Sequence, residues 1–239
     1  FQMKHGTLPP RQGLYDPANE HDACGVGFVA NFKGRKSHEI IRQGLCILEN
    51  LTHRGAVGAD PLAGDGAGIL MQIPDAFLRE ECAGLDITLP AEGDYAVGML
   101  FMPRNPGTRE YCAKLLAATI EEEGQRVLGW RDVPTNNAGL GESVRKVEPV
   151  VRQIFIERGA NCSDTDSFER KLLVIRKRVD NTIRNCDRED REHFYIPSMS
   201  ALTLCYKRML LANPVNTYYQ DLNDKRLTSA LALVHQRFS

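Results

Sequence analysis

Apolar residues recur along several segments of this chain at the spacing of amphipathic helices. This spacing predicts helices over residues 39–51, 108–123 and 165–183. Ser163 or Thr165 is expected to cap the last of these. That helix has the clearest pattern, because its apolar side chains share one face: Phe168, Leu172, Ile175, Val179 and Ile183.

Shorter apolar runs between these segments predict β-strands. They cover residues 24–32, 69–73, 95–102, 127–133, 150–157, 194–206 and 230–238. The strands outnumber the helices and do not alternate strictly with them, which favours an α+β domain over a parallel βαβ sheet. Residues 3–23 contain turn-forming pairs such as Pro9-Pro10 and Asp16-Pro17, so we expect an irregular leader there.

Composition and charge are those of an ordinary globular domain. Of the 239 residues, 42% are hydrophobic and 26% are charged, and the net charge is −1. This balance gives no reason to expect a nucleic acid or an anionic membrane as a partner. No apolar run reaches the roughly 20 residues of a membrane span. The seven cysteines are irregularly spaced without a CxxC pair, which is typical of reduced thiols in a cytoplasmic protein without a structural zinc.

Cys24 is the candidate nucleophile. If the leader were cleaved between Ala23 and Cys24, the thiol and a new α-amine would share one residue. An α-amine has a pKa of about 7.7–8.0 and a thiol one of about 8.5, so the amine can take the proton of the thiol. Gly25 and Gly27 would allow backbone and substrate to approach closely. The alternative is a buried structural cysteine at the start of a strand.

Other motifs carry weaker signals. The run Gly64–Gly68 lacks the GK[ST] ending of a phosphate loop and precedes a strand, so it indicates tight turns. His53 and His235 have no partners at metal-ligand spacing and are expected to form hydrogen bonds. Arg237, at the end of a predicted strand, is suited to bind a carboxylate in two-point fashion, although a surface arginine is the alternative.

Several motifs, taken in order, resemble one family. They are GLYDP, EHDACGVGF, HRGAV, GDGAGI and HQRFS, at residues 13–17, 20–28, 53–57, 64–69 and 235–239. This series resembles the start of the glutamate synthase large subunit, which is a class II glutamine amidotransferase domain. The resemblance covers the chain from residue 3 onward. It implies an N-terminal-nucleophile fold, a four-layer αββα sandwich in which helices enclose two antiparallel sheets.

The resemblance also implies a reaction. Cys24 would attack the side-chain amide of glutamine, release ammonia and form a glutamyl thioester that water hydrolyses. Arg237 matches the arginine that holds the substrate's α-carboxylate, and His53, Arg54 and Gly55 would shape the pocket wall. In the whole enzyme, ammonia would reach 2-oxoglutarate on a domain with FMN and an iron–sulfur cluster. A small flavoprotein subunit or ferredoxin would supply electrons, and no cofactor is expected in this chain itself.

The same resemblance divides the chain into three parts. Residues 1–2 are expected to be a tag remnant before Met3, residues 3–23 a leader, and residues 24–239 a partial amidotransferase domain. The sequence ends before the family's Asn-Gly oxyanion-hole pair and the aspartate that binds the substrate's amino group. We expect this chain alone to be inactive, since losing one oxyanion donor costs roughly 10²–10³ in rate. Open sheet edges would also favour a homo-oligomer.

Two other functions stay open at this stage. One is another class II amidotransferase, feeding a sugar-phosphate or nucleotide pathway, although the long stretch between Gly68 and His235 fits glutamate synthase better. The other is a non-catalytic binding or regulatory module that keeps the fold and never matures. The mass of the native N-terminus separates these functions, because a chain that begins at Cys24 implies catalysis.

Overall fold

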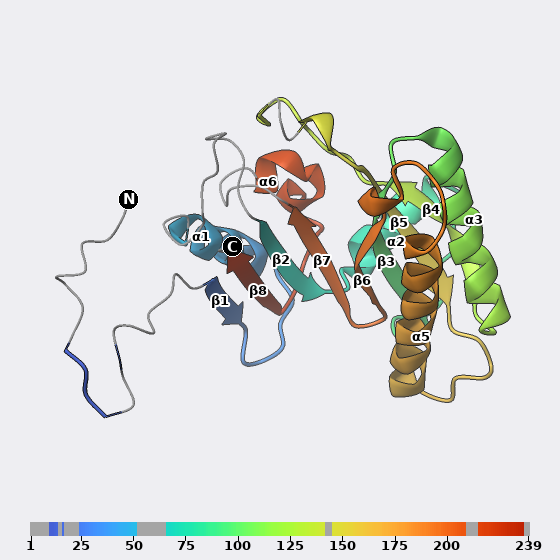
Figure 1. The fold of residues 1–239 in the computed structure, drawn as a ribbon. Helices are drawn as coiled ribbons and strands as arrows, with labels where there is room; N and C mark the ends of the chain where they lie inside the picture. Colours follow the sequence, from blue (N-terminus) through green and yellow to red (C-terminus); the bar gives the residue numbers. More distant parts are fainter. Residues whose placement is uncertain are drawn as a thin grey trace.

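Two four-stranded antiparallel sheets form the framework of the molecule (Figure 1). The computed structural model describes residues 10–13, 16, 24–51, 66–141, 145–208 and 215–236. The first sheet has the order β1-β8-β2-β7, built from Gly25–Ala30, Leu231–Gln236, Ala67–Gln72 and Thr203–Arg208. The second has the order β4-β5-β3-β6, built from Arg126–Asp132, Val150–Glu157, Tyr95–Met102 and Tyr195–Ser200.

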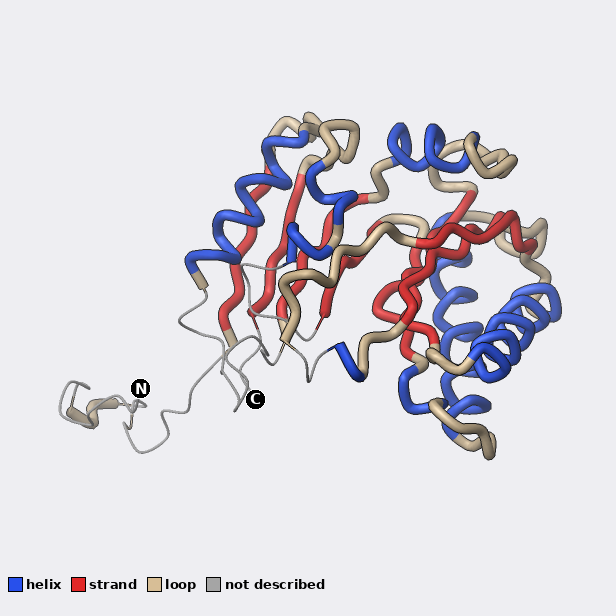
Figure 2. The backbone as a smooth tube through the Cα atoms, turned by 90° about the horizontal axis from the view of Figure 1, so that it is seen from above, coloured by secondary structure: helices blue, strands red, loops and turns tan. Residues whose placement is uncertain are grey.

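Helices pack against both sheets (Figure 2). Helix α1 (His38–Asn50) lies on the first sheet, and α3 (Pro106–Glu122) and α5 (Thr165–Arg184) lie on the second. One continuous apolar core packs α1 against the first sheet and joins the two sheets through side chains of β2, β3 and β7. A second core lies between the second sheet and helices α3 and α5. Short helices complete the described chain: α2 (Asp75–Ala83), α6 (Val215–Tyr218), and the 3₁₀ helices η4 (Arg191–His193) and η5 (Gln220–Asn223).

Glycines let α1 approach the first sheet closely. A Cβ on Gly27 of β1 would overlap the side chain of Ile47 in α1. A Cβ on Gly44 of α1 would lie 2.8 Å from the Cβ of Ala232 in β8, closer than real Cβ contacts allow. The group that approaches Gly27 closely is therefore helix α1, and not a substrate as expected from the sequence. It holds β1, the strand that follows Cys24, against the core.

The predicted α+β class with two antiparallel sheets is confirmed. Every predicted helix and strand overlaps an observed one. The single strand predicted over residues 194–206, however, is two strands in the structure. Here β6 ends at Ser200 and β7 begins at Thr203, because the Ser200 hydroxyl accepts hydrogen bonds from the N–H groups of Leu202 and Thr203, at 3.0 and 3.1 Å. This turn carries the chain from the second sheet to the first.

Two further details differ from the sequence-based expectation. The N-cap of α5 is Asp164, and neither Ser163 nor Thr165: its carboxylate accepts the N–H of Ser167 at 2.7 Å in a capping box. Helix α2 was not predicted, since it is short and follows Pro74 without a polar cap. No helix in the described ranges is long and apolar enough to cross a membrane.

Candidate active site

Cys24 lies immediately before β1 and is exposed. The strand register pairs Gly25 of β1 with Gln236 of β8, and Gln236 in turn with Ala67 of β2. Gly25 follows Cys24 in the sequence and Gln236 precedes Arg237. Strand pairing thus brings together the neighbours of the candidate nucleophile and of the candidate carboxylate-binding residue, from opposite ends of the chain.

The other predicted site residues lie outside the described residues. These are Arg237, His53, Arg54 and Gly55. Their roles stay predictions that rest on the sequence. The glycine run after them is described only from Gly66 onward, where it leads directly into β2.

Burial distinguishes Cys24 from most of the other thiols. Burial raises the pKa of Cys82, Cys112 and Cys205 to about 11, so these thiols stay protonated near neutral pH. Since the thiolate is the reactive form, they are poor nucleophiles. Cys46 is exposed like Cys24, but it lies within α1, where its Sγ accepts a hydrogen bond from Asn50 at 3.8 Å.

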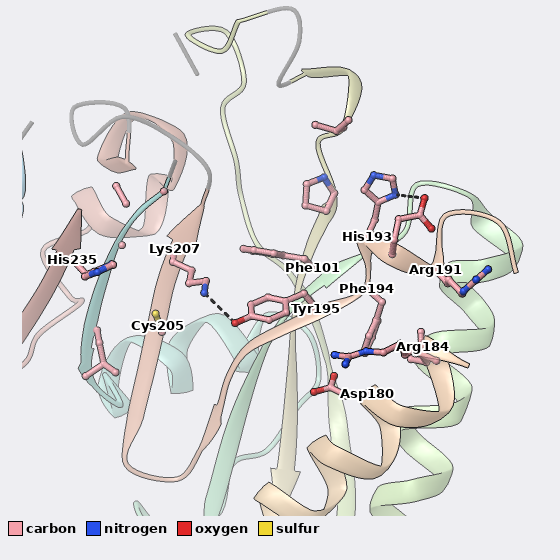
Figure 3. Close-up of a pocket in the computed structure, with 18 of the residues that line it drawn as sticks. Phe101, Asp180, Arg184, Arg191, His193, Phe194, Tyr195, Cys205, Lys207 and His235 are labelled. Atoms are coloured by element: carbon pink, nitrogen blue, oxygen red, sulfur yellow. Dashed lines mark hydrogen bonds and ion pairs between the residues drawn. The ribbon is translucent and has the colours of Figure 1, made fainter. Parts of the chain in front are cut away.

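A cavity of about 1090 Å³ opens between the first sheet and the end of α5 (Figure 3). Leu70, Leu233 and His235 line it from the first sheet, on the face that α1 leaves uncovered. Residues of α5, η4 and β6 form the opposite wall. In β1, Val26 pairs with His235 and is 60% exposed, so it belongs to the same face. Cys24 precedes Val26 by two residues, the period of one strand face, although it is not among the described lining residues.

Lys207 and Tyr195 connect the two sheets across this cavity (Figure 3). The Lys207 ammonium donates a hydrogen bond to the Tyr195 hydroxyl at 3.1 Å and lies 4.7 Å from the centre of its ring. Asp180 of α5 also lines the cavity, and burial raises the pKa of its carboxyl. The cavity therefore combines apolar walls with a few charged groups, which is typical of sites for small polar ligands.

Sequence reasoning did not single out Lys207, Tyr195 or Gln236. The first two meet because the turn after Ser200 brings β7 back beside β6, and the sequence pattern predicts no turn there. Gln236 carries a signal that could have been used. It continues the alternate buried positions of Ala232 and Val234, where a polar side chain is unusual.

Comparison with known proteins identifies the family of this chain. The sequence profile of the family described as "Glutamine amidotransferases class-II" matches residues 24–239, so the match begins at Cys24. The glutamate synthase [NADPH] large chain of Bacillus subtilis (strain 168) is 47% identical, over 99% of this chain and 15% of that protein. The glutamate synthase [NADH] of Schizosaccharomyces pombe is 39% identical, over 98% of this chain and 11% of that protein.

The name of a third relative gives ferredoxin as the electron donor in place of NADPH or NADH. The chloroplastic ferredoxin-dependent glutamate synthase 2 of Arabidopsis thaliana is 34% identical, over 95% of this chain and 14% of that protein. The chain thus spans no more than about a seventh of the length of these relatives. The family match covers nearly the whole chain and starts at the candidate nucleophile. The chain belongs to the class II glutamine amidotransferases.

Proposed function

We propose that this chain is the glutaminase part of a glutamate synthase, with Cys24 as its nucleophile. The observation that carries the proposal is the match of the family profile from Cys24 onward. The thiolate of Cys24 attacks the side-chain amide carbon of glutamine, and the C–N bond breaks to release ammonia. Water then hydrolyses the glutamyl thioester, which gives glutamate and restores the thiol.

The proton in this reaction moves through the α-amine of Cys24. Removal of residues 3–23 frees this amine, which takes the proton of the thiol and returns it to the departing ammonia. In this scheme the amidotransferase domain begins at residue 24. The exposure of Cys24 supports the scheme, because both cleavage and substrate need access to it.

Arg237 is proposed to hold the α-carboxylate of glutamine, with His53, Arg54 and Gly55 in the pocket wall. The pairing of Gly25 with Gln236 supports the role of Arg237, since a substrate held by one strand end would lie beside the other. A guanidinium matches a carboxylate in two-point geometry, so lysine at this position would be a poor replacement.

In the complete enzyme, the ammonia is proposed to aminate 2-oxoglutarate, with FMN and an iron–sulfur cluster on another domain. The described residues bring one set of potential metal-binding side chains together, Asp190, Glu192 and His193, and no cysteine belongs to it. These donors do not fit an iron–sulfur cluster, which thiolates hold. The relatives named for NADPH, NADH and ferredoxin support a flavoprotein subunit or ferredoxin as the electron-donating partner.

The cytoplasm is the proposed location. All seven cysteines lie in the described chain and none of them forms a disulfide there, as in reducing compartments. A second copy of this chain is a further proposed partner, since β1 is an edge strand in the described part of its sheet and could pair with another strand.

Glutamine hydrolysis by the complete protein tests the central proposal. Cys24→Ala should lower kcat by at least about 10³-fold, because the nucleophile is lost. Cys46→Ala is the matched control, since it removes the other exposed thiol and should leave kcat unchanged. Mass spectrometry of the native N-terminus should show a chain that begins at Cys24.

Other results would favour other functions. Retention of the leader in the complete protein, with no glutamine hydrolysis, would indicate a binding module. Hydrolysis that produces ammonia without amination of 2-oxoglutarate would indicate a different class II amidotransferase. Hydrolysis that survives Cys24→Ala would refute the assigned nucleophile.

A further inference from the structure

Gln236 carries a buried amide that has no hydrogen-bonding partner. The residue is 0% exposed, and neither its Oε1 nor its Nε2 makes a hydrogen bond within the described part of the chain. A buried amide without a partner destabilises a folded protein, and such groups are uncommon. Its presence beside the candidate nucleophile therefore requires an explanation.

The position of Gln236 limits what its amide can reach. Along β8, Ala232, Val234 and Gln236 are buried on the side of α1. Both cross-strand neighbours of Gln236 are small: Gly25 has no side chain and Ala67 has only a methyl group. A long side chain between them can therefore extend to the end of β1, where Cys24 begins.

A second buried glutamine, Gln153, has an amide that forms hydrogen bonds at both ends within the fold. Gln153 of β5 is also 0% exposed. Its Oε1 accepts a hydrogen bond from Arg131 at 3.0 Å, and its Nε2 donates one to the hydroxyl of Tyr206 at 3.3 Å. The amide of Gln153 is satisfied at both ends, whereas that of Gln236 is satisfied at neither.

We propose that Gln236 is a positioning residue, whose Oε1 accepts a hydrogen bond from the α-amine that leader removal exposes on Cys24. The proposal rests on the proposed function. Before cleavage, the nitrogen of Cys24 is a planar amide with a single N–H. After cleavage it is an amine that rotates and carries two N–H groups and a lone pair. Donation of one N–H to Gln236 fixes this rotation and directs the lone pair toward Sγ.

The same contact assists the reaction once the proton moves. When the amine takes the proton of the thiol, it becomes an ammonium group. A hydrogen bond from a charged donor is stronger than one from a neutral donor, so Oε1 stabilises this form. The amide that destabilises the precursor thus gains its partner in the mature protein.

The test uses the complete protein with methionine placed directly before Cys24, so that removal of the methionine exposes the amine in every variant. Gln236→Met keeps the length of the side chain and removes the acceptor. Its kcat for glutamine hydrolysis should fall by about 10- to 100-fold with little change in KM, because the base is misplaced while binding is retained. Gln236→Glu keeps an acceptor oxygen and should retain a clearly higher kcat than Gln236→Met.

Thermal unfolding separates positioning from a structural role. In the protein that still carries its leader, Gln236→Met should not lower the melting temperature, since there it replaces an amide without a partner. The matched control Gln153→Met should lower the melting temperature, because Arg131 and Tyr206 each lose a partner, and should keep kcat.

Three results would overturn the proposal. The first is a wild-type kcat in Gln236→Met, and the second is a loss of kcat in Gln236→Met together with a fall in melting temperature like that of Gln153→Met. The third is a kcat of Gln236→Glu no higher than that of Gln236→Met. Failure of the proposed glutaminase function would give other results than these three. In that case the wild-type protein itself would not hydrolyse glutamine, or Cys24→Ala would remain active.

Discussion

Arg131 of β4 and Asp221 of η5 form a buried two-point ion pair. Arg131 donates from Nη1 to Oδ2 and from Nη2 to Oδ1, both at 2.8 Å, and the two side chains are 5% and 3% exposed. Tyr206 of β7 donates its hydroxyl hydrogen to the same carboxylate at 2.8 Å. Because β4 and β7 belong to different sheets, this cluster fastens the second sheet to the first.

The first prediction concerns this ion pair. Arg131→Met should lower the free energy of unfolding by about 3–5 kcal/mol, since it leaves the Asp221 carboxylate buried without its cation. The double variant Arg131→Met/Asp221→Leu should recover part of the loss, because no buried charge remains. Urea unfolding, followed by circular dichroism, measures both variants.

Arg126→Met is the control for the ion pair. Arg126 also lies in β4 and pairs with Glu157, but its side chain is 69% exposed, so its loss should change the stability little. An Arg131→Met variant as stable as Arg126→Met would show that the buried pair does not fasten the sheets.

The second prediction concerns the contact of Gly27 with Ile47. Gly27→Ala should destabilise the protein by about 1–3 kcal/mol, because the new methyl group would overlap Ile47 of α1. Ile47→Ala removes the overlapping atom. In a double-mutant cycle, Gly27→Ala should therefore cost less in the Ile47→Ala background than in the wild type. Equal costs in the two backgrounds would contradict the close contact.

The elements of this fold were predicted more accurately than their connections. Strands β3 and β5 have their predicted bounds. β3 is a continuous apolar run, and β5 is an apolar run interrupted by Arg152 and Gln153. The boundary between β6 and β7 was missed because Ala201 and Leu202 are not turn-forming residues. The hydroxyl of Ser200 makes that turn instead, through a hydrogen bond that composition does not indicate.

The candidate site was predictable in chemistry but not in arrangement. Cys24 stood out because its neighbours form a motif, and a motif is local in the sequence. The pairing of Gly25 with Gln236 depends on the strand order β1-β8-β2, which inserts the last described strand between two early ones. No local pattern fixes such an order, since it follows from the packing of the whole sheet against α1.

The third prediction concerns the cap of α5. The hydrogen bond from the N–H of Ser167, together with the Ser167 and Ser163 hydroxyls, lowers the pKa of the Asp164 carboxyl. A carboxyl whose pKa is lower in the folded state than in the unfolded state stabilises the fold above its unfolded pKa of about 3.9. This contribution is lost as the pH falls through the folded pKa.

Asp164→Ala should accordingly lower the melting temperature at neutral pH, and the difference from wild type should shrink in acid. Asp164→Asn keeps an acceptor oxygen for the N–H of Ser167 without a titrating group, so it should lose less at neutral pH. Thermal unfolding at pH about 7 and about 3 measures both effects. A difference between Asp164→Ala and wild type that grows in acid would contradict the role of the carboxylate.

The fourth prediction is an order of thiol alkylation. Iodoacetamide reacts with thiolates, and at pH about 8 a thiol with a pKa of about 11 is only about 0.1% ionised. Cys82, Cys112 and Cys205 should therefore react last, and the exposed Cys24 and Cys46 first. Peptide mapping by mass spectrometry at increasing times gives the order.

Alkylation in the presence of glutamine tests which of the exposed thiols lies at the substrate site. In the complete, mature protein, saturating glutamine should slow the alkylation of Cys24, because bound substrate and the thioester cover its thiol. Cys46 lies in α1 and should react at the same rate with and without glutamine. Equal protection of both thiols would indicate a general change in the protein, and protection of neither would place glutamine away from Cys24.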